Sequence, residues 1–278
     1  MTIKCLVSRP LLRLGLTLGL GLLAANSAFA QATATQQKPF EPKVGQAGKD
    51  VVWVPTSQEL VNKMLDMAKV TPKDFVMDLG SGDGRTVITA AKRGATAVGI
   101  EYNPEMVELS KRNAEKEGVT AKATFMKADL FEIDFSKATV ITMFLLPDIN
   151  VRLRPKILAL KPGTRVVSNS FTMEDWDADQ TETISGECTS WCTALLWIVP
   201  AKVDGTWQTP QGELKLTQQY QKVSGTLGSA KVEGKLNGDE ITLTTVAAAG
   251  KQTYTGKVSG NSIQGTASGG GAWTATKR

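Results

Sequence analysis

The sequence of 278 residues contains no histidine. This absence excludes a serine–histidine–aspartate triad, a cysteine–histidine dyad, histidine-ligated zinc and an imidazole that acts as a general base. Cysteine is scarce, with 3 residues, and aromatic side chains make up only 6% of the chain. The chemistry of this protein must therefore use carboxylates, amines, hydroxyls, thiols or a bound cofactor.

The chain also lacks a strong excess of either charge. Its 32 basic and 27 acidic residues give a net charge of +5, which does not by itself predict a nucleic-acid partner, and none is expected. With 41% hydrophobic residues the composition is globular, and the length allows one large domain or two smaller ones.

Residues 1–30 have the pattern of a secretory signal peptide. Three basic residues precede an apolar run at 14–25, and Ala28-Phe29-Ala30 resembles a cleavage site. The run has 12 residues, too few to span a membrane. We expect an exported protein, periplasmic or secreted, without a membrane span after cleavage, and with its net charge reduced to +2. An uncleaved N-terminus that anchors the protein to a membrane is the alternative.

Cleavage would leave two cysteines, Cys188 and Cys192, which are a disulfide candidate in an oxidising compartment. On one straight strand their Cα atoms would lie roughly 13 Å apart, too far for a disulfide. A tight turn between them would allow the bond, and two packed thiols are the alternative.

An alternating helix and strand pattern follows a linker. Residues 31–50 are polar and without periodicity, which predicts a disordered linker. From Val51 onward, predicted strands and helices alternate, which indicates a doubly wound, mostly parallel Rossmann-like sheet in a domain of residues 51–203. The predicted strands cover residues 75–79, 97–100, 123–126, 138–146 and 165–169, and the predicted helices begin near residues 56, 85, 104 and 151.

Residues 204–278 have a different pattern and hold 13 of the 26 glycines. Seven short alternating runs, separated by turns such as Asn237-Gly238, predict an antiparallel meander of six or seven strands in a small barrel or sandwich. Gly205-Thr206-Trp207 is weakly similar to the opening strand of lipocalin- or avidin-like barrels. We expect a packing or docking module, with ligand binding inside the barrel as the alternative.

The sequence Asp78-Leu79-Gly80-Ser81-Gly82-Asp83-Gly84 ends a predicted strand and begins a helix. Glycines let the backbone approach a ligand closely, and a helix start offers free N–H groups. Glu101 ends the next strand, where its carboxylate can accept hydrogen bonds from both hydroxyls of a ribose. The combination predicts a nucleoside ligand.

The glycine spacing argues against a dinucleotide. The dinucleotide fingerprint G-x-G-x-x-G/A fails because the sixth position from Gly80 is Arg85. Asp78 and Asp83 also place negative charge where a pyrophosphate would lie. They suit a ligand that carries an ammonium and a sulfonium, which describes S-adenosylmethionine (SAM).

Residues 52–200 resemble the class I SAM-dependent methyltransferases, and more narrowly the lysine methyltransferases related to the ATP synthase c-subunit methyltransferase. The resemblance covers roughly half the chain. The segments that carry it are Val54-Pro55-Thr56, residues 78–85, residues 98–104, Ala128-Asp129-Leu130-Phe131 and Phe144-Leu145-Leu146-Pro147.

The resemblance implies SAM as cofactor and a set of contacts to it. Asp78 would face the methionine amine, Glu101 the ribose, and Asp129 the adenine amine. Leu146 and Pro147 would line the methyl-transfer opening. The residues implied on the cofactor side are Thr56, Asp78, Gly80, Ser81, Gly82, Gly84, Glu101, Tyr102, Asn103, Asp129 and Leu130.

Simpler structural roles remain open for several of these residues. Thr56 would form a capping box with Glu59, Asp129 would start a turn, and Leu146-Pro147 would only end a strand. Asn103, followed by Pro104, is also expected to cap a helix.

The predicted function is methyl transfer from SAM to an unidentified acceptor, for which the resemblance implies a protein lysine as partner. No catalytic base and no metal site is predicted, so water or a carboxylate would take the proton of the amine. The alternative is an exported, non-catalytic binding protein that retains the methyltransferase fold. The signal peptide favours this alternative because SAM is made in the cytosol.

Overall fold

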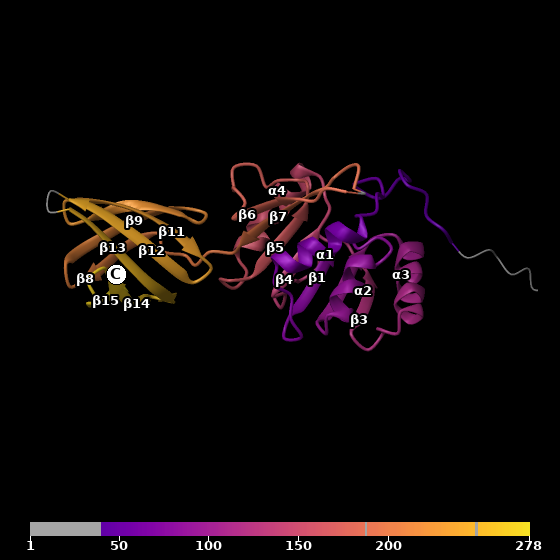
Figure 1. Cartoon of the computed structure of the whole chain (residues 1–278), viewed down its shortest axis with the longest axis horizontal. Coiled ribbons are helices and arrows are strands. Elements are labelled where there is room, and N and C mark those ends of the chain that lie inside the picture. Colours follow the sequence, from indigo (N-terminus) through magenta and orange to yellow (C-terminus); the bar gives the residue numbers. More distant parts are fainter. Residues whose placement is uncertain (1–39, 187, 248–249) are drawn as a thin grey trace, which may run out of the picture. The chain divides into compact units, whose positions relative to one another are not determined.

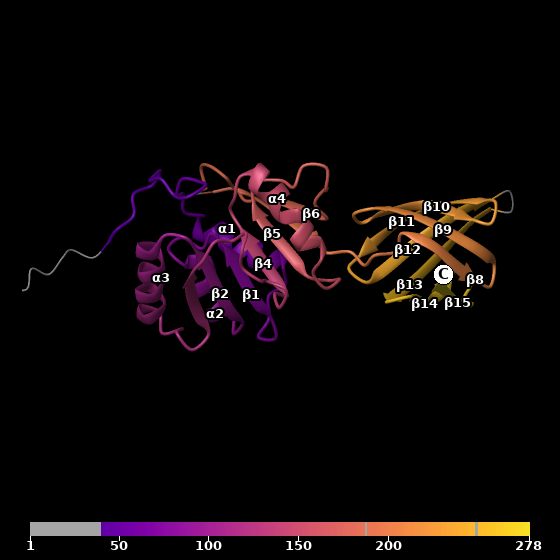
Figure 2. The same cartoon turned by 180° about the vertical axis from the view of Figure 1, so that it is seen from behind.

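A computed structural model describes residues 40–278 except 187 and 248–249. The predicted signal peptide and the first part of the predicted linker lie outside these residues. The described chain forms an α/β domain followed by a β-barrel. Figure 1 and Figure 2 show the elements of both from opposite sides. No helix among the described residues is long and apolar enough to cross a membrane.

The α/β domain is a seven-stranded sheet in the order β3-β2-β1-β4-β5-β7-β6. Strands β1 to β5 run parallel, as predicted, whereas β7 and β6 are an antiparallel extension that the sequence pattern did not indicate. The elements are α1 Gln58–Met67, β1 Phe75–Leu79, α2 Arg85–Lys92, β2 Thr96–Glu101, α3 Pro104–Lys116, β3 Ala123–Lys127, β4 Val140–Met143, α4 Pro147–Leu158, β5 Arg165–Asn169, β6 Gln180–Thr183 and β7 Thr193–Ile198.

Hydrophobic clusters cover both faces of this sheet. Neighbouring residues of a strand point to opposite faces, so Val76 packs against α1 and α2 whereas Met77 packs against α4. The central strand β1 is buried over four of its five positions. This double burial explains why the central strands are continuous apolar runs.

Two helix starts differ from the prediction. The N-cap of α1 is Ser57, whose hydroxyl accepts a hydrogen bond from the N–H of Leu60, so the capping box expected at Thr56 is wrong. Helix α4 begins at Pro147 rather than near residue 151, because proline is suited to the first helical turn. The cap of α3 is Asn103, as predicted, with its side chain accepting from the N–H of Glu105.

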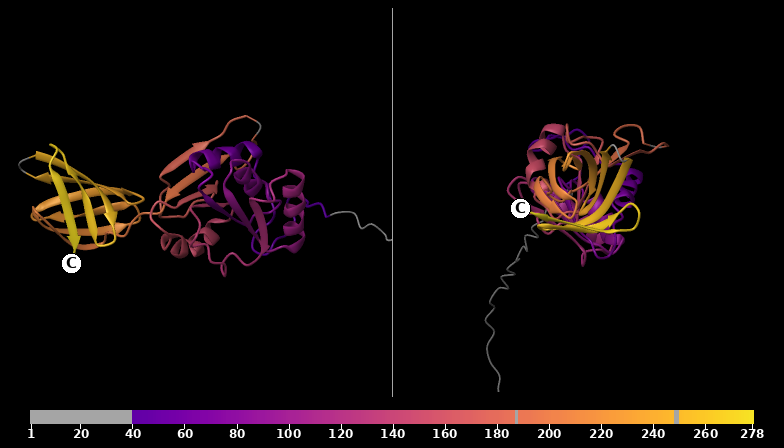
Figure 3. Two further views of the ribbon diagram at one scale, coloured as in Figure 1. Left: turned by 90° about the horizontal axis from the view of Figure 1, so that it is seen from below. Right: turned by 90° about the vertical axis from the view of Figure 1, so that its left-hand side faces the viewer.

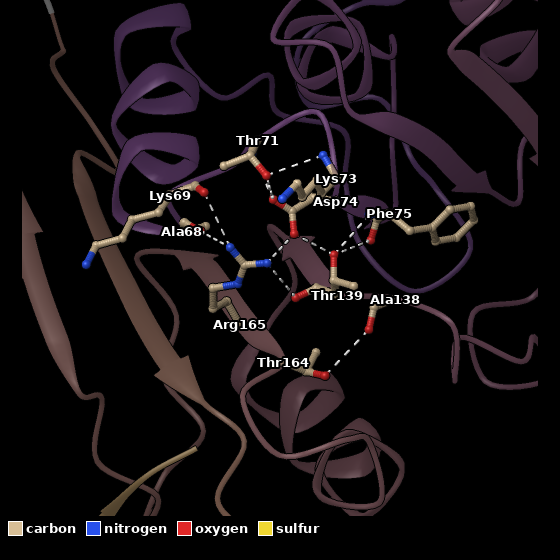
Figure 4. Close-up of polar contacts among 10 residues, drawn as sticks. All are labelled: Ala68, Lys69, Thr71, Lys73, Asp74, Phe75, Ala138, Thr139, Thr164 and Arg165. Atoms are coloured by element: carbon tan, nitrogen blue, oxygen red, sulfur yellow. Dashed lines mark hydrogen bonds and ion pairs between the residues drawn. The ribbon is translucent and has the colours of Figure 1, made fainter. Parts of the chain in front are cut away.

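A buried ion pair joins β1 to β5 at the amino ends of these strands (Figure 4). Asp74 accepts hydrogen bonds from Arg165, Thr139 and Thr71. Burial opposes its ionisation, but these hydrogen bonds together hold the pKa of Asp74 below its ordinary value. The Arg165 guanidinium also donates to the carbonyl of Ala68 just beyond α1. The network therefore ties the helix and the two strands together.

The second domain is a closed eight-stranded antiparallel barrel, one strand more than the upper end of the prediction. Each strand pairs with the next, and β15 closes the barrel on β8. Figure 3 shows the strands arranged around a common centre. The strands are β8 Gly205–Thr209, β9 Gly212–Gln219, β10 Lys222–Leu227, β11 Ala230–Asn237, β12 Glu240–Ala247, β13 Gly250–Ser259, β14 Ser262–Ala267 and β15 Ala272–Lys277.

The barrel interior is filled by side chains. Trp207 and Trp273 are among its largest members and are at most 1% exposed. Close packing between strands requires glycine at Gly225, where a Cβ would lie 1.8 Å from the carbonyl oxygen of Lys215. Glycine therefore permits close approach of neighbouring strands there. The barrel core also includes Ala201 and Val203, slightly before the predicted start at residue 204.

Candidate active site

A pocket opens at the carboxyl ends of β1, β2 and β4. In the sheet order, β1 has β2 on one side and β4 on the other, so the pocket lies where the winding reverses, the usual ligand site of doubly wound sheets. The lining segments are residues 46–56, 80–83, 100–103, 128–130 and 143–145, together with Asp78 and several single side chains.

Part of the predicted linker is ordered and forms a wall of this pocket. Ala47 and Val52 form an antiparallel bridge, and the N–H of Gly45 donates to the carbonyl of Trp53. The expectation of disorder is therefore wrong for these residues. The short polar stretch is held by backbone hydrogen bonds and by contact with the sheet domain, which its composition alone does not reveal.

The glycine loop turns sharply after β1. Gly80, Gly82 and Gly84 all have positive φ, of 80°, 54° and 83°, a conformation that favours glycine. A Cβ at Gly82 would lie 2.7 Å from the indole nitrogen of Trp53, so the loop and the segment that closes the pocket are in close contact there. The hydroxyl of Ser81 is buried and has no hydrogen-bond partner among the described residues. The loop thus has an unsatisfied polar atom next to the pocket.

Asp78 lies in the pocket wall with only 6% of its surface exposed. The hydroxyl of Thr142, its register partner on β4, donates to its carboxylate at 2.6 Å. Burial raises the pKa of Asp78 to about 7, the charges of Asp83 and Glu101 add to the rise, and the Thr142 hydrogen bond opposes it. Within the described part of the chain, no lysine or arginine pairs with this carboxyl. A ligand ammonium would supply the missing positive charge.

Glu101 holds the glycine loop from the end of β2. One carboxylate oxygen accepts from the N–H of Gly82 at 2.9 Å, and the other accepts from the N–H of Asn103 at 2.9 Å. Each oxygen has a further lone pair, so the carboxylate can still accept hydrogen bonds from vicinal hydroxyls. Tyr102, next to it, is 49% exposed at the rim.

Asp129 and Leu130 follow β3 and lie on the side of the pocket near Tyr102. One oxygen of Asp129 accepts from the N–H of Phe131 at 2.9 Å, which gives this residue the turn role left open above. The other accepts from Lys49, whose ammonium also lies 5.0 Å from the ring centre of Tyr102. The Lys49 pair and the Phe131 hydrogen bond lower the pKa of Asp129. Lys49 was not anticipated because its segment has no periodic pattern.

Thr56 joins three parts of the site. Its hydroxyl accepts from the side-chain amide of Asn169 at 3.2 Å, and its carbonyl accepts from Arg85 at 2.7 Å. The same Arg85 guanidinium donates to both oxygens of Asp83. Asp83 is thus held by Arg85, and the N-cap of α2, Gly84, provides no side-chain hydrogen bond to the helix. Arg85 is the residue at the sixth loop position that argued against a dinucleotide. By donating to Asp83 and to the carbonyl of Thr56, it links the glycine loop to the pocket wall at Thr56.

The segment after β4 lines the pocket with residues up to Leu145, one residue before the predicted Leu146. Met143, Phe144 and Leu145 are among the lining residues, whereas Leu146 is 40% exposed and is the N-cap residue of α4. Leu146 and Pro147 therefore begin helix α4 at the edge of the site, rather than end a strand as the simpler alternative had it. Leu145 packs over the loop, since a Cβ at Gly80 would lie 3.1 Å from its side chain.

A disulfide joins Cys188 to Cys192, with Cα atoms 5.8 Å apart. The two cysteines lie in the turn between β6 and β7 rather than on one strand, which brings them together. Both pack partly buried against the core cluster of α1 and α2.

These residues fit SAM. The buried carboxyl of Asp78 lacks a cation, and the glycines of the loop place no side chain between the backbone and the pocket. The sheet order, this loop and the carboxylates of Asp78, Glu101 and Asp129 define a class I SAM-dependent methyltransferase. The individual contacts to SAM stay predictions.

Comparisons with known proteins agree with this class and narrow it. The ANTKMT methyltransferase domain family matches residues 78–180. A protein-lysine N-methyltransferase of Saccharolobus islandicus is 50% identical over 130 residues, which are 46% of this chain and 81% of the relative. The chain belongs to this family of SAM-dependent methyltransferases.

Two further relatives are similar over a comparable share of the chain. The human lysine N-methyltransferase of the ATP synthase c-subunit is 35% identical over 136 residues, which are 49% of this chain and 57% of the relative. An RNA methyltransferase from Salinibacter ruber, solved with S-adenosyl-L-homocysteine, is 43% identical with a TM-score of 0.51. This similarity covers 54% of the chain and 96% of the solved structure.

Proposed function

We propose that this methyltransferase transfers the methyl group of SAM to lysine side chains of a protein. The observation that carries the proposal is the 50% identity to a protein-lysine N-methyltransferase over 81% of that relative. The site geometry supports it, because the pocket brings together the buried carboxyl, the glycine loop and the strand-end carboxylates that SAM requires.

Different residues of the pocket would bind different parts of SAM. Asp78 pairs with the methionine ammonium next to the glycine loop. Glu101 accepts from the ribose hydroxyls, and Asp129 accepts from the adenine amine beside Leu130. Thr56 lies at the methionine end, where Arg85 and Asn169 hold its carbonyl and hydroxyl.

Positioning is the main contribution of the protein to the reaction. SAM supplies a methyl group on a positively charged sulfur, so the lone pair of the amine forms the new N–C bond while the C–S bond breaks and its electrons remain on sulfur. The amine must be neutral before it attacks, and its proton passes to water or to a carboxylate. This chain contains no histidine that could take it.

We also propose that the protein is exported. The basic residues before the apolar run at 14–25 and the Ala28-Phe29-Ala30 sequence support a cleaved signal peptide. The Cys188–Cys192 disulfide supports an oxidising compartment. N-terminal sequencing of the native protein tests this proposal, with a start at residue 31 as the expected result. A retained Met1 contradicts it.

The acceptor is tested with methyl-labelled SAM and two substrates, denatured serum albumin and transfer RNA. Label is expected in methylated lysine after acid hydrolysis of the protein, and none is expected with Asp78→Asn as the matched control. Label in the RNA would instead assign the activity in the name of the Salinibacter ruber structure. SAM binding by calorimetry without label in either substrate favours the non-catalytic binding protein.

A further inference from the structure

Three aromatic rings form a continuous cluster beside the pocket. Phe144 follows β4 and lines the pocket, and Phe171 follows β5 with its ring centre 5.7 Å away, nearly parallel. Trp191, from the turn between β6 and β7, meets Phe144 edge-on at 6.0 Å. We call Phe144, Phe171 and Trp191 the aromatic cluster. Its rings extend from the pocket wall to solvent, since Trp191 is 46% exposed.

Trp191 is held in an unfavourable state for its residue type. Its φ is 54°, in the left-handed region that is unfavourable for a residue with a side chain. Exposure of a large indole also forfeits burial of apolar area. Backbone strain together with an exposed aromatic ring at the edge of a ligand pocket indicates a functional position rather than a packing one.

The disulfide holds this position. Trp191 directly precedes Cys192, and the Cys188–Cys192 bond closes a loop whose two ends pack against the core. The N–H of Ile184 donates to the carbonyl of Cys192 at 2.9 Å, and the N–H of Ser170 donates to the carbonyl of Thr193 at 2.7 Å. The backbone directly after Trp191 is therefore held by the disulfide and by these two hydrogen bonds, which places the indole next to Phe144.

We propose that the aromatic cluster is the acceptor subsite, which takes the aliphatic amine of a lysine, and that the Cys188–Cys192 disulfide is a positioning element for Trp191. This inference rests on the proposed lysine acceptor. Aromatic faces pack against the methylene stem of the lysine and attract its ammonium by cation–π interaction before the amine loses its proton. Phe144 and Phe171 stack on each other, so a flat nucleobase has no free slot between them.

The test is calorimetry with two ligands on the full chain. One is S-adenosyl-L-homocysteine, and the other is its analogue with nitrogen in place of sulfur and a four-carbon aminoalkyl chain on that nitrogen. Wild type is expected to bind the aminoalkyl ligand about tenfold or more tightly. Trp191→Ala is expected to lose about tenfold of that affinity, and Trp191→Phe to recover part of it, while S-adenosyl-L-homocysteine affinity stays within about twofold. Val246→Ala, at another exposed apolar residue that lies in the barrel, is the matched control.

The disulfide is tested by Cys188→Ser/Cys192→Ser, which keeps Trp191. This variant is expected to bind the aminoalkyl ligand about threefold to tenfold more weakly, while its affinity for S-adenosyl-L-homocysteine is unaffected. Equal binding of the aminoalkyl ligand by wild type and both variants overturns the inference, as does no gain over S-adenosyl-L-homocysteine in wild type. Tighter binding of an analogue with a flat aryl group than of the aminoalkyl ligand overturns the inference and favours a nucleobase as the acceptor. Failure of wild type to bind S-adenosyl-L-homocysteine would instead contradict the proposed function.

Discussion

Asp78→Asn is expected to stabilise the protein while it abolishes cofactor binding. The Asp78 carboxyl is buried and lacks a cationic partner, so its ionisation in the free protein lowers the free energy of unfolding. Asparagine keeps an oxygen that can accept the Thr142 hydroxyl and carries no charge. The substitution removes the buried charge and leaves the neighbouring hydrogen bond in place.

The direction in which the free energy of unfolding changes with pH follows from proton linkage. The native pKa of about 7 lies above the ordinary 3.8, so the native state holds a proton that the unfolded state has lost between these values. The stability of the wild type therefore falls as pH rises through this window and levels off above it. At about 1.4 kcal/mol per pKa unit, the full penalty is on the order of 4 kcal/mol.

Urea unfolding at pH 4, 6 and 8 without SAM measures this difference. Helical circular dichroism reports on the α/β domain, because all helices of the described residues lie there. Asp78→Asn is expected to match wild type near pH 4 and to exceed it by up to about 4 kcal/mol at pH 8. Equal stability at pH 8 would refute the account of a buried, unpaired carboxyl. By the same linkage, wild-type affinity for SAM should fall by about fivefold from pH 7 to pH 6.

Three further results are expected. Glu101→Ala should weaken SAM binding by about 1.5–3 kcal/mol in calorimetry, and unchanged affinity would remove Glu101 from the cofactor site. Gly118→Ala should lower the free energy of unfolding by about 1–2 kcal/mol in thermal unfolding, because of its positive φ alone. Gly84→Ala should lower it clearly more, because its Cβ would also lie 2.7 Å from the ring of Phe125. Equal losses of stability in the two variants would refute the clash with Phe125. Arg165→Met should cost about 3 kcal/mol at pH 7 by leaving Asp74 unpaired. Because the pKa of Asp74 is lowered in the native state, that loss should shrink as pH falls below 3.8, and a constant loss would contradict the ion pair.

Much of the fold could be predicted because its local signals agree with one another. The strands Phe75–Leu79 and Arg165–Asn169 and the helix Arg85–Lys92 have their predicted bounds, since each is a periodic run between strong turn signals. The barrel runs were equally clear, because glycine turns separate them. Strand β6 was missed because Gln180–Thr183 is mostly exposed and carries no apolar alternation, whereas β7 is an apolar run that the prediction did not recognise as a strand.

Most of the predicted site residues line one pocket, because they follow the carboxyl ends of neighbouring parallel strands; Gly84, Leu146 and Pro147 are not among the lining residues. Lys49, Trp53 and Phe144 were not foreseen in the pocket. Lys49 and Trp53 come from an aperiodic segment whose path depends on tertiary contacts. Phe144 belongs to the motif at the end of β4, but the prediction placed Leu146 and Pro147 of that motif at the pocket instead. No local pattern reports such long-range placement.

The closure of β15 on β8 sets an order for folding during synthesis. The α/β domain has all its strands once β7 has been made, so it can pack while the barrel strands are still being added. The barrel cannot close until Thr276 and Lys277 reach their partners Gln208 and Trp207. Until then β8 presents an unpaired edge that can join a strand of another chain. Loss of the final strand would therefore turn a closed module into one prone to aggregation.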